Sequence, residues 1–302
     1  MKQLDRKIKS PLTGGDTSLI KEFETSDIVK RYKDQFNIDV RNFFDEIDNF
    51  YLFKCNESSY EFYAPFTLSG NDDFYKELSS FDWYYMPWKW EHEQTLKYAL
   101  KANSILEVGC GSGSYLKKIK EIFPNKTVTG LEITMSEEAE PFIINQTVED
   151  YASRNFQQYD MICSFQVLEH ITDVKSFLEA SLKLLKPGGC LVISVPNNDS
   201  VFFKEKGEVI LNMPPHHMGL WNKNSLSYLT KVFPILLRKT YFEPIQSYHF
   251  LWFKTIIQKK LKDGRPKYFK KLFANKYSLR IICSILSKLY KGHSIMTIYE
   301  KK

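Results

Sequence analysis

The sequence predicts an α/β fold whose central sheet contains parallel strands. Residues 105–108 form a short apolar run typical of a buried parallel strand, and residues 115–123 carry apolar side chains on one helical stripe. Gly109, Gly111 and Gly113 lie between them, so these glycines are expected in a strand-to-helix turn. A chain of 302 residues is long enough for one full-size α/β domain and a smaller second unit.

The glycine turn is expected to bind a ligand. A residue without a Cβ lets the backbone approach a bound molecule, and the helix N-terminus offers unpaired N–H groups. The spacing is Gly-x-Gly-x-Gly, with Glu107 two residues earlier, whereas the dinucleotide fingerprint is Gly-x-Gly-x-x-Gly. This difference favours a smaller adenosine ligand only weakly. Glu132, near the end of the next apolar run, can accept both hydroxyls of a ribose under either interpretation.

Two later stretches distinguish these interpretations. Residues 159–170 read YDMICSFQVLEH, and residues 184–189 read LLKPGG before another apolar run. In this order the motifs resemble the class I methyltransferases that depend on S-adenosylmethionine (SAM). Within that class the chain is most similar to the small-molecule group that includes the ubiquinone-pathway O-methyltransferases, which share residues 147–149 and 168–170. The resemblance covers about residues 86–245 and the final strand.

The resemblance implies a Rossmann-like, doubly wound sheet of seven strands, with the last strand antiparallel and SAM across the strand ends. It places Glu107, Gly109, Gly111, Gly113 and Glu132 at the cofactor. It also implies that an acceptor in 146–149, with Gln146 as a candidate, reads the adenine amine, and that the backbone of Phe165 meets the amino-acid moiety. A sulfonium suits an aromatic ring face, so Tyr85, Trp90 and His92 are candidates to cover the methionine end or the acceptor, with ordinary aromatic packing as the alternative.

Methyl transfer to a hydroxyl benefits from a base, and histidine has the most suitable unperturbed pKa. His170 follows the fourth expected strand, where cofactor and acceptor should meet, and Glu169 could orient its ring. A structural histidine–carboxylate pair is the alternative. Some related enzymes carry an acid at the position of Gln166 and bind a divalent metal there. An amide is a poorer ligand for a hard cation, so no metal is expected.

The loop 213–221 supplies a second set of candidates. His216 and His217 are adjacent in this loop, after two prolines, and they are expected to act as base or to bind the acceptor. A structural turn is the alternative. Asn197 and Asn198 directly follow an expected strand and are candidates to line the acceptor pocket.

The pattern divides the chain into four parts. Residues 1–20 read as a loose tail, and 21–85 as an N-terminal lobe that either packs on the core or forms a lid. Within the lobe we expect helices over 28–36 and 40–50 and a hairpin over 51–64. Residues 86–245 and 294–302 form the expected SAM-binding core, and 246–293 form a basic helical insertion.

The insertion has an unusual charge. Residues 251–291 contain twelve Lys or Arg and one acid, a net charge of +11 in a chain of net charge +6. Aromatic and aliphatic residues are interspersed among these charges. The pattern is compatible with a solvated basic face, with an anionic lipid or membrane surface, or with nucleic acid, which is disfavoured because no RNA-binding module is evident.

Other features place the chain among ordinary intracellular proteins. Its five cysteines form no C-x-x-C pair, and the sequence shows neither a signal peptide nor a long uncharged apolar run. We therefore expect a cytoplasmic protein, with peripheral contact at a membrane as an alternative. The expected function is SAM-dependent methylation of a small-molecule acceptor, most readily on oxygen. A nicotinamide-dependent dehydrogenase and a catalytically silent SAM-fold binding module are the competing classes.

Overall fold

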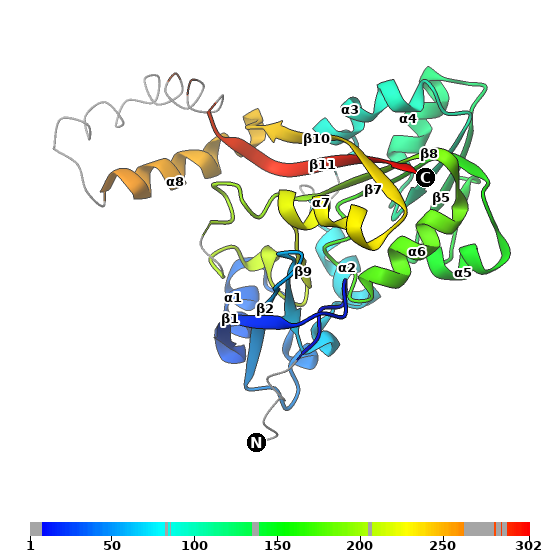
Figure 1. The fold of residues 1–302 in the computed structure, drawn as a ribbon. Coiled ribbons are helices and arrows are strands. Elements are labelled where there is room, and N and C mark those ends of the chain that lie inside the picture. The colour runs from blue at the N-terminus through cyan, green and yellow to red at the C-terminus, as the bar shows by residue number, and fades with distance from the viewer. Residues whose placement is uncertain are drawn as a thin grey trace.

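A computed structural model describes residues 8–81, 84, 86–134, 139–204, 207–262, 281, 285 and 289–302. In this part of the chain the strands form two sheets, one of seven strands and one of four. The larger sheet forms the expected core, and the smaller sheet forms a separate lobe beneath it (Figure 1).

The large sheet has the strand order β10-β11-β8-β7-β4-β5-β6. Its strands are β4 (Ser104–Val108), β5 (Thr127–Leu131), β6 (Ile143–Ile144), β7 (Tyr159–Phe165), β8 (Leu185–Pro196), β10 (Ile235–Pro244) and β11 (Lys291–Lys301). β4 pairs in parallel with β5 and β7, whereas β11 is antiparallel to both β8 and β10. This topology confirms the expected doubly wound sheet with an antiparallel last strand.

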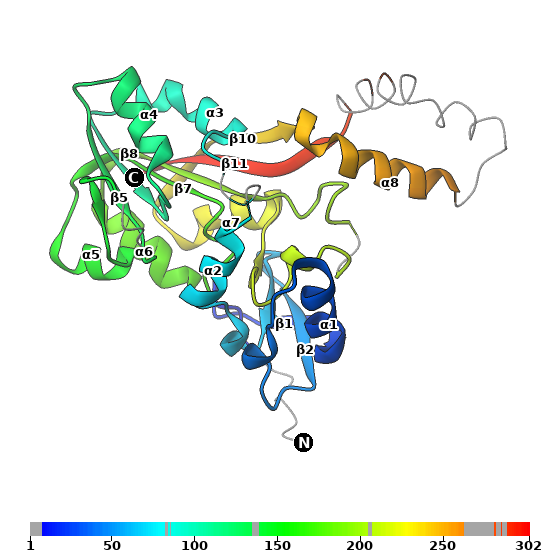
Figure 2. The same ribbon diagram turned by 180° about the vertical axis from the view of Figure 1, so that it is seen from behind.

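Helices cover both faces of this sheet (Figures 1 and 2). On one face lie α3 (Trp90–Ala99) and α4 (Ser114–Ile122). On the other face lie α5 (Val148–Arg154), α6 (Val174–Leu184) and α7 (Lys223–Val232). The buried side chains of α4, including Leu116 and Ile119, form the apolar stripe that the sequence predicts.

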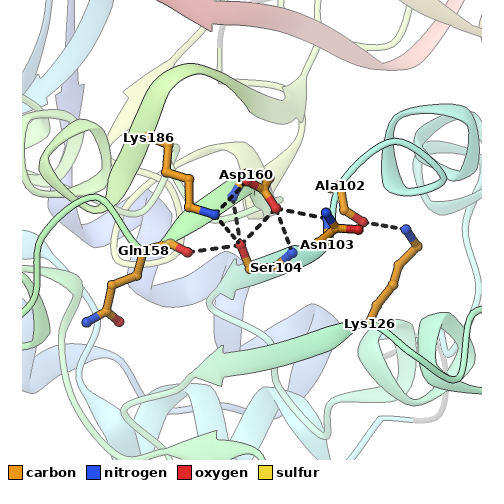
Figure 3. A network of polar contacts seen from close by, with 7 residues as sticks. All are labelled: Ala102, Asn103, Ser104, Lys126, Gln158, Asp160 and Lys186. Carbon is orange, nitrogen blue, oxygen red and sulfur yellow. Dashed lines mark hydrogen bonds and ion pairs between the residues drawn. The ribbon is translucent and has the colours of Figure 1, made fainter.

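A polar network holds the amino-terminal edge of the sheet (Figure 3). The carboxylate of Asp160 in β7 accepts hydrogen bonds from the backbone N–H groups of Asn103 and Ser104, both at 2.9 Å, and pairs with Lys186 Nζ at 2.7 Å. Lys126 Nζ donates to the carbonyl of Ala102 nearby. The network joins β4, β7 and β8 at the edge opposite the candidate site.

The N-terminal lobe contains a sheet of order β1-β2-β3-β9. Its strands are β1 (Thr17–Glu24), β2 (Asn49–Cys55), β3 (Glu61–Ala64) and β9 (Gly219–Leu220). β2 and β3 form the expected hairpin. β9 comes from the loop after β8, so this sheet is completed by a segment of the core and ties the lobe to it.

The lobe also contains α1 (Thr25–Phe36) and α2 (Asp72–Ser79). Two expectations for the N-terminal part of the chain were wrong. Of the expected loose tail 1–20, residues 1–7 lie outside the described residues, and 8–20 are not loose, because Leu12 is fully buried and β1 begins at Thr17. Residues 40–50 do not form one helix, because only the short turn η1 (Arg41–Phe43) is helical and β2 begins at Asn49.

The connection from β10 to β11 begins with the turns and helices expected of an insertion. The short helix η4 (Ser247–His249) leads directly into α8 (Phe250–Lys262), which projects from the core (Figure 1). Most of the basic stretch 263–288 lies outside the described residues. Within the described helices, none combines the length and apolar character needed to cross a bilayer.

Candidate functional site

A cavity of about 640 Å³ opens at the carboxyl-terminal edge of the large sheet. The ends of four strands contribute Glu107, Glu132, Phe165 and Pro196 to its wall. In open α/β sheets ligands bind at this edge. The N-terminal lobe and the insertion contribute other walls, so the cavity lies where the parts of the chain meet.

The glycine turn forms one end of the cavity. Gly109, Gly111 and Gly113 all have positive φ, at 72°, 53° and 75°. A Cβ on Gly109 would lie 2.4 Å from Cγ2 of Val167, so protein packing as well as backbone conformation requires glycine there. Gly109 and Gly111 line the cavity. Gly113 is instead the residue before α4, and a Cβ there would lie 2.9 Å from Cδ1 of Ile143.

Glu132 is held against this turn. Its Oε2 accepts the backbone N–H of Gly111 at 2.8 Å, and its Oε1 accepts those of Ile133 and Thr134 at 2.9 and 3.1 Å. These contacts orient the carboxylate at the end of β5, where its remaining lone pairs can accept the hydroxyls of a ribose.

Glu107 lies beside Glu132 and is almost completely buried. Its Oε2 has no hydrogen-bond partner among the described residues. Burial, and then the charge of Glu132, raise the pKa of Glu107 well above its usual value. A buried carboxyl without a partner is costly, so this oxygen is positioned to pair with a polar or cationic group of a ligand.

Gln146 and the three residues after it line the same end of the cavity. Phe165 lines the cavity at the end of β7, and its ring packs against His92 and Tyr115, with ring centroids 4.9 and 5.0 Å away. Trp90 does not reach the cavity and packs on the core cluster around these rings. Tyr85 lies outside the described residues.

The three candidate histidines come together in the other half of the cavity. The ring centroids of His170 and His216 lie 4.8 Å apart, and those of His170 and His217 lie 5.0 Å apart. The backbone explains this meeting, because the carbonyl of Glu169 accepts the N–H groups of Met218 and Gly219, both at 2.8 Å. β9 then anchors this loop to the lobe.

Hydrogen bonds select the tautomer of each ring. Nδ1 of His216 donates to the carbonyl of Leu211 at 2.7 Å, and Nδ1 of His170 donates to the carbonyl of His216 at 2.5 Å. Nδ1 of His217 donates to Oδ1 of Asn212 at 3.0 Å. Each Nε2 therefore carries a lone pair. Nε2 of His216 accepts the hydroxyl of Tyr84 at 3.0 Å.

Burial keeps these rings neutral. It lowers the pKa of His170 to about 4, although the hydrogen bond to the His216 carbonyl opposes this shift. Burial also lowers the pKa values of His216 and His217 well below the usual value, and the neighbouring histidines add to the effect. A base is most effective when its pKa lies near the working pH, so these histidines are better hydrogen-bond acceptors than proton acceptors.

The pKa of Glu169 is shifted in the opposite direction to those of the histidines. Glu169 is 1% exposed and lines the cavity, and neither carboxyl oxygen has a hydrogen-bond partner among the described residues. Burial raises its pKa to about 8. The expectation that Glu169 orients the ring of His170 was wrong, because the His216 carbonyl and the hydroxyl of Tyr75 contact Nδ1 of His170 instead.

Asn197 and Asn198 are buried but do not line the cavity. Asn198 acts indirectly, since its Oδ1 accepts a hydrogen bond from Nδ2 of Asn212 at 2.8 Å, and Asn212 holds His217. These hydrogen bonds run from Asn198, just after β8, through Asn212 to the ring of His217.

Several cavity-lining residues were missed by sequence reasoning. Tyr75 and Tyr84 lie in the N-terminal lobe, Glu243 lies just before the insertion, and His249 and His293 lie at its two ends. They are far apart in sequence and belong to no local motif. A weak signal existed for the last three, because the ends of a large insertion at the ligand edge of a sheet are placed to reach the site.

Two groups of described side chains place three potential metal-ligating atoms within 4.8 Å of one another. One contains His170, His216 and His217, and the other contains Glu243, His249 and His293. The side-chain amide of Gln166 donates to Glu91, Ser194 and Ser294 at 3.3–3.5 Å. The backbone of Gln166 interacts with His170.

Comparison with known proteins identifies the family of the central domain. Residues 84–233 match the family model of a methyltransferase domain. This part of the chain belongs to that family. The SAM-binding elements expected of such a domain are the glycine turn and Glu132, both within the matched range.

The methyltransferase domain has curated relatives that act in ubiquinone biosynthesis. The ubiquinone biosynthesis O-methyltransferases of Salmonella typhimurium and Salmonella typhi are each 30% identical over 130 residues, which are 38% of this chain and 53% of the relative. The chain thus spans about half the length of the curated relatives it matches.

Solved structures of methyltransferases are also similar to the chain. A SAM-dependent methyltransferase from Archaeoglobus fulgidus is 17% identical, with a TM-score of 0.46 over 70% of this chain and 93% of the other. The N-methyltransferase NodS from Bradyrhizobium japonicum, in complex with S-adenosyl-L-homocysteine, is 15% identical, with a TM-score of 0.41 over 70% and 85%.

Proposed function

We propose that the protein transfers a methyl group from SAM to a hydroxyl oxygen of a small-molecule acceptor. The observation that carries this proposal is the continuity of one cavity. It joins the glycine turn and Glu132 at one end to Glu169 and the histidine group at the other. A cofactor and an acceptor bound there would face each other, and alignment is the main requirement of a displacement at a methyl group.

The cofactor end fits SAM on three counts. Glu132 is oriented for a ribose, Gly109 and Gly111 expose backbone at the cavity wall, and Glu107 offers an unpaired buried oxygen. When bound, SAM supplies a methyl group already activated by its sulfonium. Ligand pockets are usually about 300–1,000 Å³, so the cavity of about 640 Å³ has room for an acceptor beside the cofactor.

At the acceptor end we assign the proton acceptor to Glu169 and not to a histidine. Its pKa of about 8 lies close to neutral pH, and both of its oxygens are free of partners among the described residues. His170 and His217 would orient the acceptor hydroxyl through Nε2, since their Nδ1 atoms already donate to fixed carbonyl oxygens.

The cavity wall and the names of the curated relatives support a cyclic acceptor. Tyr75, Tyr84 and Trp252 line the acceptor end and suit an aromatic or sugar ring. The curated relatives are named as O-methyltransferases of ubiquinone biosynthesis, which supports an aromatic hydroxyl. Hydroxylated aromatic precursors are therefore the first acceptors to test, followed by sugars and glycan-lipid intermediates.

The direct test is an assay with methyl-labelled SAM and panels of hydroxylated aromatics and sugars. We expect turnover on one class in the wild-type protein and a loss of about 100-fold in Glu169→Gln, the size expected for removing a general base. SAM binding without turnover on any panel member, together with liposome binding through the insertion, would favour the silent binding module instead.

Contact of the insertion with an anionic membrane is a second proposal. Leu251 on α8 is 80% exposed, and the exposed residues Ile281, Ile285 and Leu289 lie in the same basic stretch. Exposed apolar side chains among positive charges suit an anionic lipid surface. Co-sedimentation with phosphatidylserine vesicles, lost in a chain lacking 251–290, tests this contact, and equal binding to neutral vesicles would contradict it.

A further inference from the structure

A second polar group lies where the two ends of the insertion meet. Glu243 is near the end of β10, His249 ends η4, and His293 is near the start of β11. All three line the cavity, and one potential ligand atom from each lies within 4.8 Å of the others. A Cβ on Gly292 would lie 2.5 Å from the carbonyl oxygen of Glu243, so glycine permits the close approach that brings His293 beside Glu243.

The carboxylate of this group is fixed by its neighbours. Oε1 of Glu243 accepts the hydroxyl of Tyr248 at 2.6 Å, and Oε2 accepts the backbone N–H of Ser294 at 3.0 Å. Glu243 is 2% exposed. Metal-ligating carboxylates are typically held by outer partners of this kind.

Each imidazole can offer one ring nitrogen to a metal. The hydroxyl of Ser294, 3.2 Å from Nδ1 of His293, can accept its proton and leave Nε2 free. A metal on Nε2 of His249 requires a proton on Nδ1. In this state Nδ1 no longer accepts the N–H of Gln246 and faces it as a second donor, so the ring must turn away from this contact, which at 3.4 Å is long for a hydrogen bond.

A second buried carboxyl is linked to this group. Glu91 is also 2% exposed. Gln166 links them, since its amide donates to Glu91 at 3.3 Å and to Oγ of Ser294 at 3.5 Å. Two carboxyl groups beside two imidazoles offer oxygen and nitrogen lone pairs, which are the donors that a divalent transition metal prefers.

The other histidine group is less suited to a metal. The hydroxyl of Tyr84 donates to Nε2 of His216, while the carbonyl of Leu211 holds Nδ1. That ring therefore has both nitrogens engaged, and a metal would have to displace Tyr84.

We propose that Glu243, His249 and His293 bind one divalent transition-metal ion. Two imidazoles and one carboxylate suit Zn²⁺, Co²⁺ or Mn²⁺ and leave coordination positions open toward the cavity. An oxygen of the acceptor would take such a position. This role in acceptor binding depends on the proposed function, whereas metal binding itself does not.

The test uses the full chain after removal of metals with a chelator. Calorimetric titration with Zn²⁺ and absorption spectra with Co²⁺ report binding without turnover. Glu243→Gln is the key variant, because glutamine can keep contacts to Tyr248 and Ser294 while losing the charge. His293→Ala removes a ligand. His92→Ala is the matched control, since it removes another buried, cavity-lining histidine outside the group.

We expect the wild-type protein and His92→Ala to bind Zn²⁺ at this site, with a rise in Tm on adding metal. We expect Glu243→Gln and His293→Ala each to lose at least tenfold in affinity and to lose the rise in Tm. Each variant is compared with itself with and without metal, so destabilisation does not obscure the result. Absence of metal binding overturns the proposal. Binding that is unchanged in both ligand variants also overturns it. A further variant, His217→Ala, removes a member of the other histidine group, and binding that is lost only in this variant would place the metal there and overturn the proposal.

Discussion

Nδ1 of His217 donates a hydrogen bond to Oδ1 of Asn212 at 3.0 Å, and Asn212 is itself held by Asn198. Because these hydrogen bonds keep the proton of His217 on Nδ1, its lone pair is on Nε2. In the proposed function that lone pair orients the acceptor, so the buried asparagine acts on the reaction through the histidine.

Replacing Asn212 by alanine should slow methyl transfer. Without an acceptor at Nδ1, the ring of His217 can rotate or change tautomer, and misplacement of a group that positions the acceptor costs about 10- to 100-fold in rate. We expect kcat to fall by this factor, with SAM affinity unchanged. Asn212→Asp retains an oxygen at this position and should recover part of the rate. Equal rates in the wild-type protein and both variants would show that these hydrogen bonds do not position the acceptor through His217.

The pH dependence of the reaction should follow Glu169. Its pKa is raised to about 8, mainly by burial, and only the ionised form accepts a proton. Activity should therefore rise with pH through about 8 and level off above it. In Glu169→Gln the rise should disappear and kcat should fall, while SAM affinity stays the same. If the profile keeps its rise in the variant, another group carries the proton.

The network around Asp160 should stabilise the fold at neutral pH and should lose this effect in acid. Burial alone would raise the pKa of Asp160, but hydrogen bonds from Lys186, Ser104 and Asn103 outweigh it and lower the pKa to about 2. Because the folded-state pKa lies below the unfolded value of about 4, this stabilisation is complete above pH 4. It is lost as the pH falls toward 2.

Asp160→Asn should lower the free energy of unfolding at pH 7 by about 1 kcal/mol, a modest value because the pair with Lys186 is partly exposed. The difference from the wild-type protein should shrink between pH 4 and pH 2. Denaturant unfolding at several pH values measures it, and a difference that is constant with pH would contradict the assignment.

Gly109→Ala should be more destabilising than its backbone conformation alone requires. Its Cβ would lie 2.4 Å from Val167, whereas Gly188 has nearly the same φ, +73° against +72°, and no atom within 4 Å of a Cβ. Gly188→Ala is therefore a matched control that carries only the conformational cost, about 1–2 kcal/mol. We expect Gly109→Ala to cost at least 1 kcal/mol more, from overpacking. Val167→Ala should recover part of that difference, and equal costs for the two glycines would refute the steric argument.

Much of the core could be predicted from the sequence because its signals are local. The strand–glycine–helix unit of 104–122 and the acid at 132 lie within about thirty residues, and each has a direct physical meaning. The pairing of His170 with His216 and His217 could be anticipated only in part. Both segments were expected at the same sheet edge, whereas the contact depends on backbone bonds from Met218 and Gly219 to Glu169.

Other features depend on long-range packing that no local pattern encodes. β9 adds a strand from the core to the lobe sheet, and Glu243 meets His293 across the whole insertion. The protonation behaviour of Glu169 and of the histidines likewise follows from burial in the folded state. Sequence reasoning therefore placed the base on a histidine, whereas we propose the neighbouring carboxyl of Glu169.

Calorimetric titration with SAM tests the central claim most directly. We expect the wild-type protein to bind one SAM, Glu132→Ala to lose measurable binding, and Glu179→Ala, which removes an exposed acid of α6 that does not line the cavity, to retain it. Thermal unfolding of each variant shows that it is folded. Unchanged affinity in folded Glu132→Ala would contradict the assignment of this cavity as the SAM site.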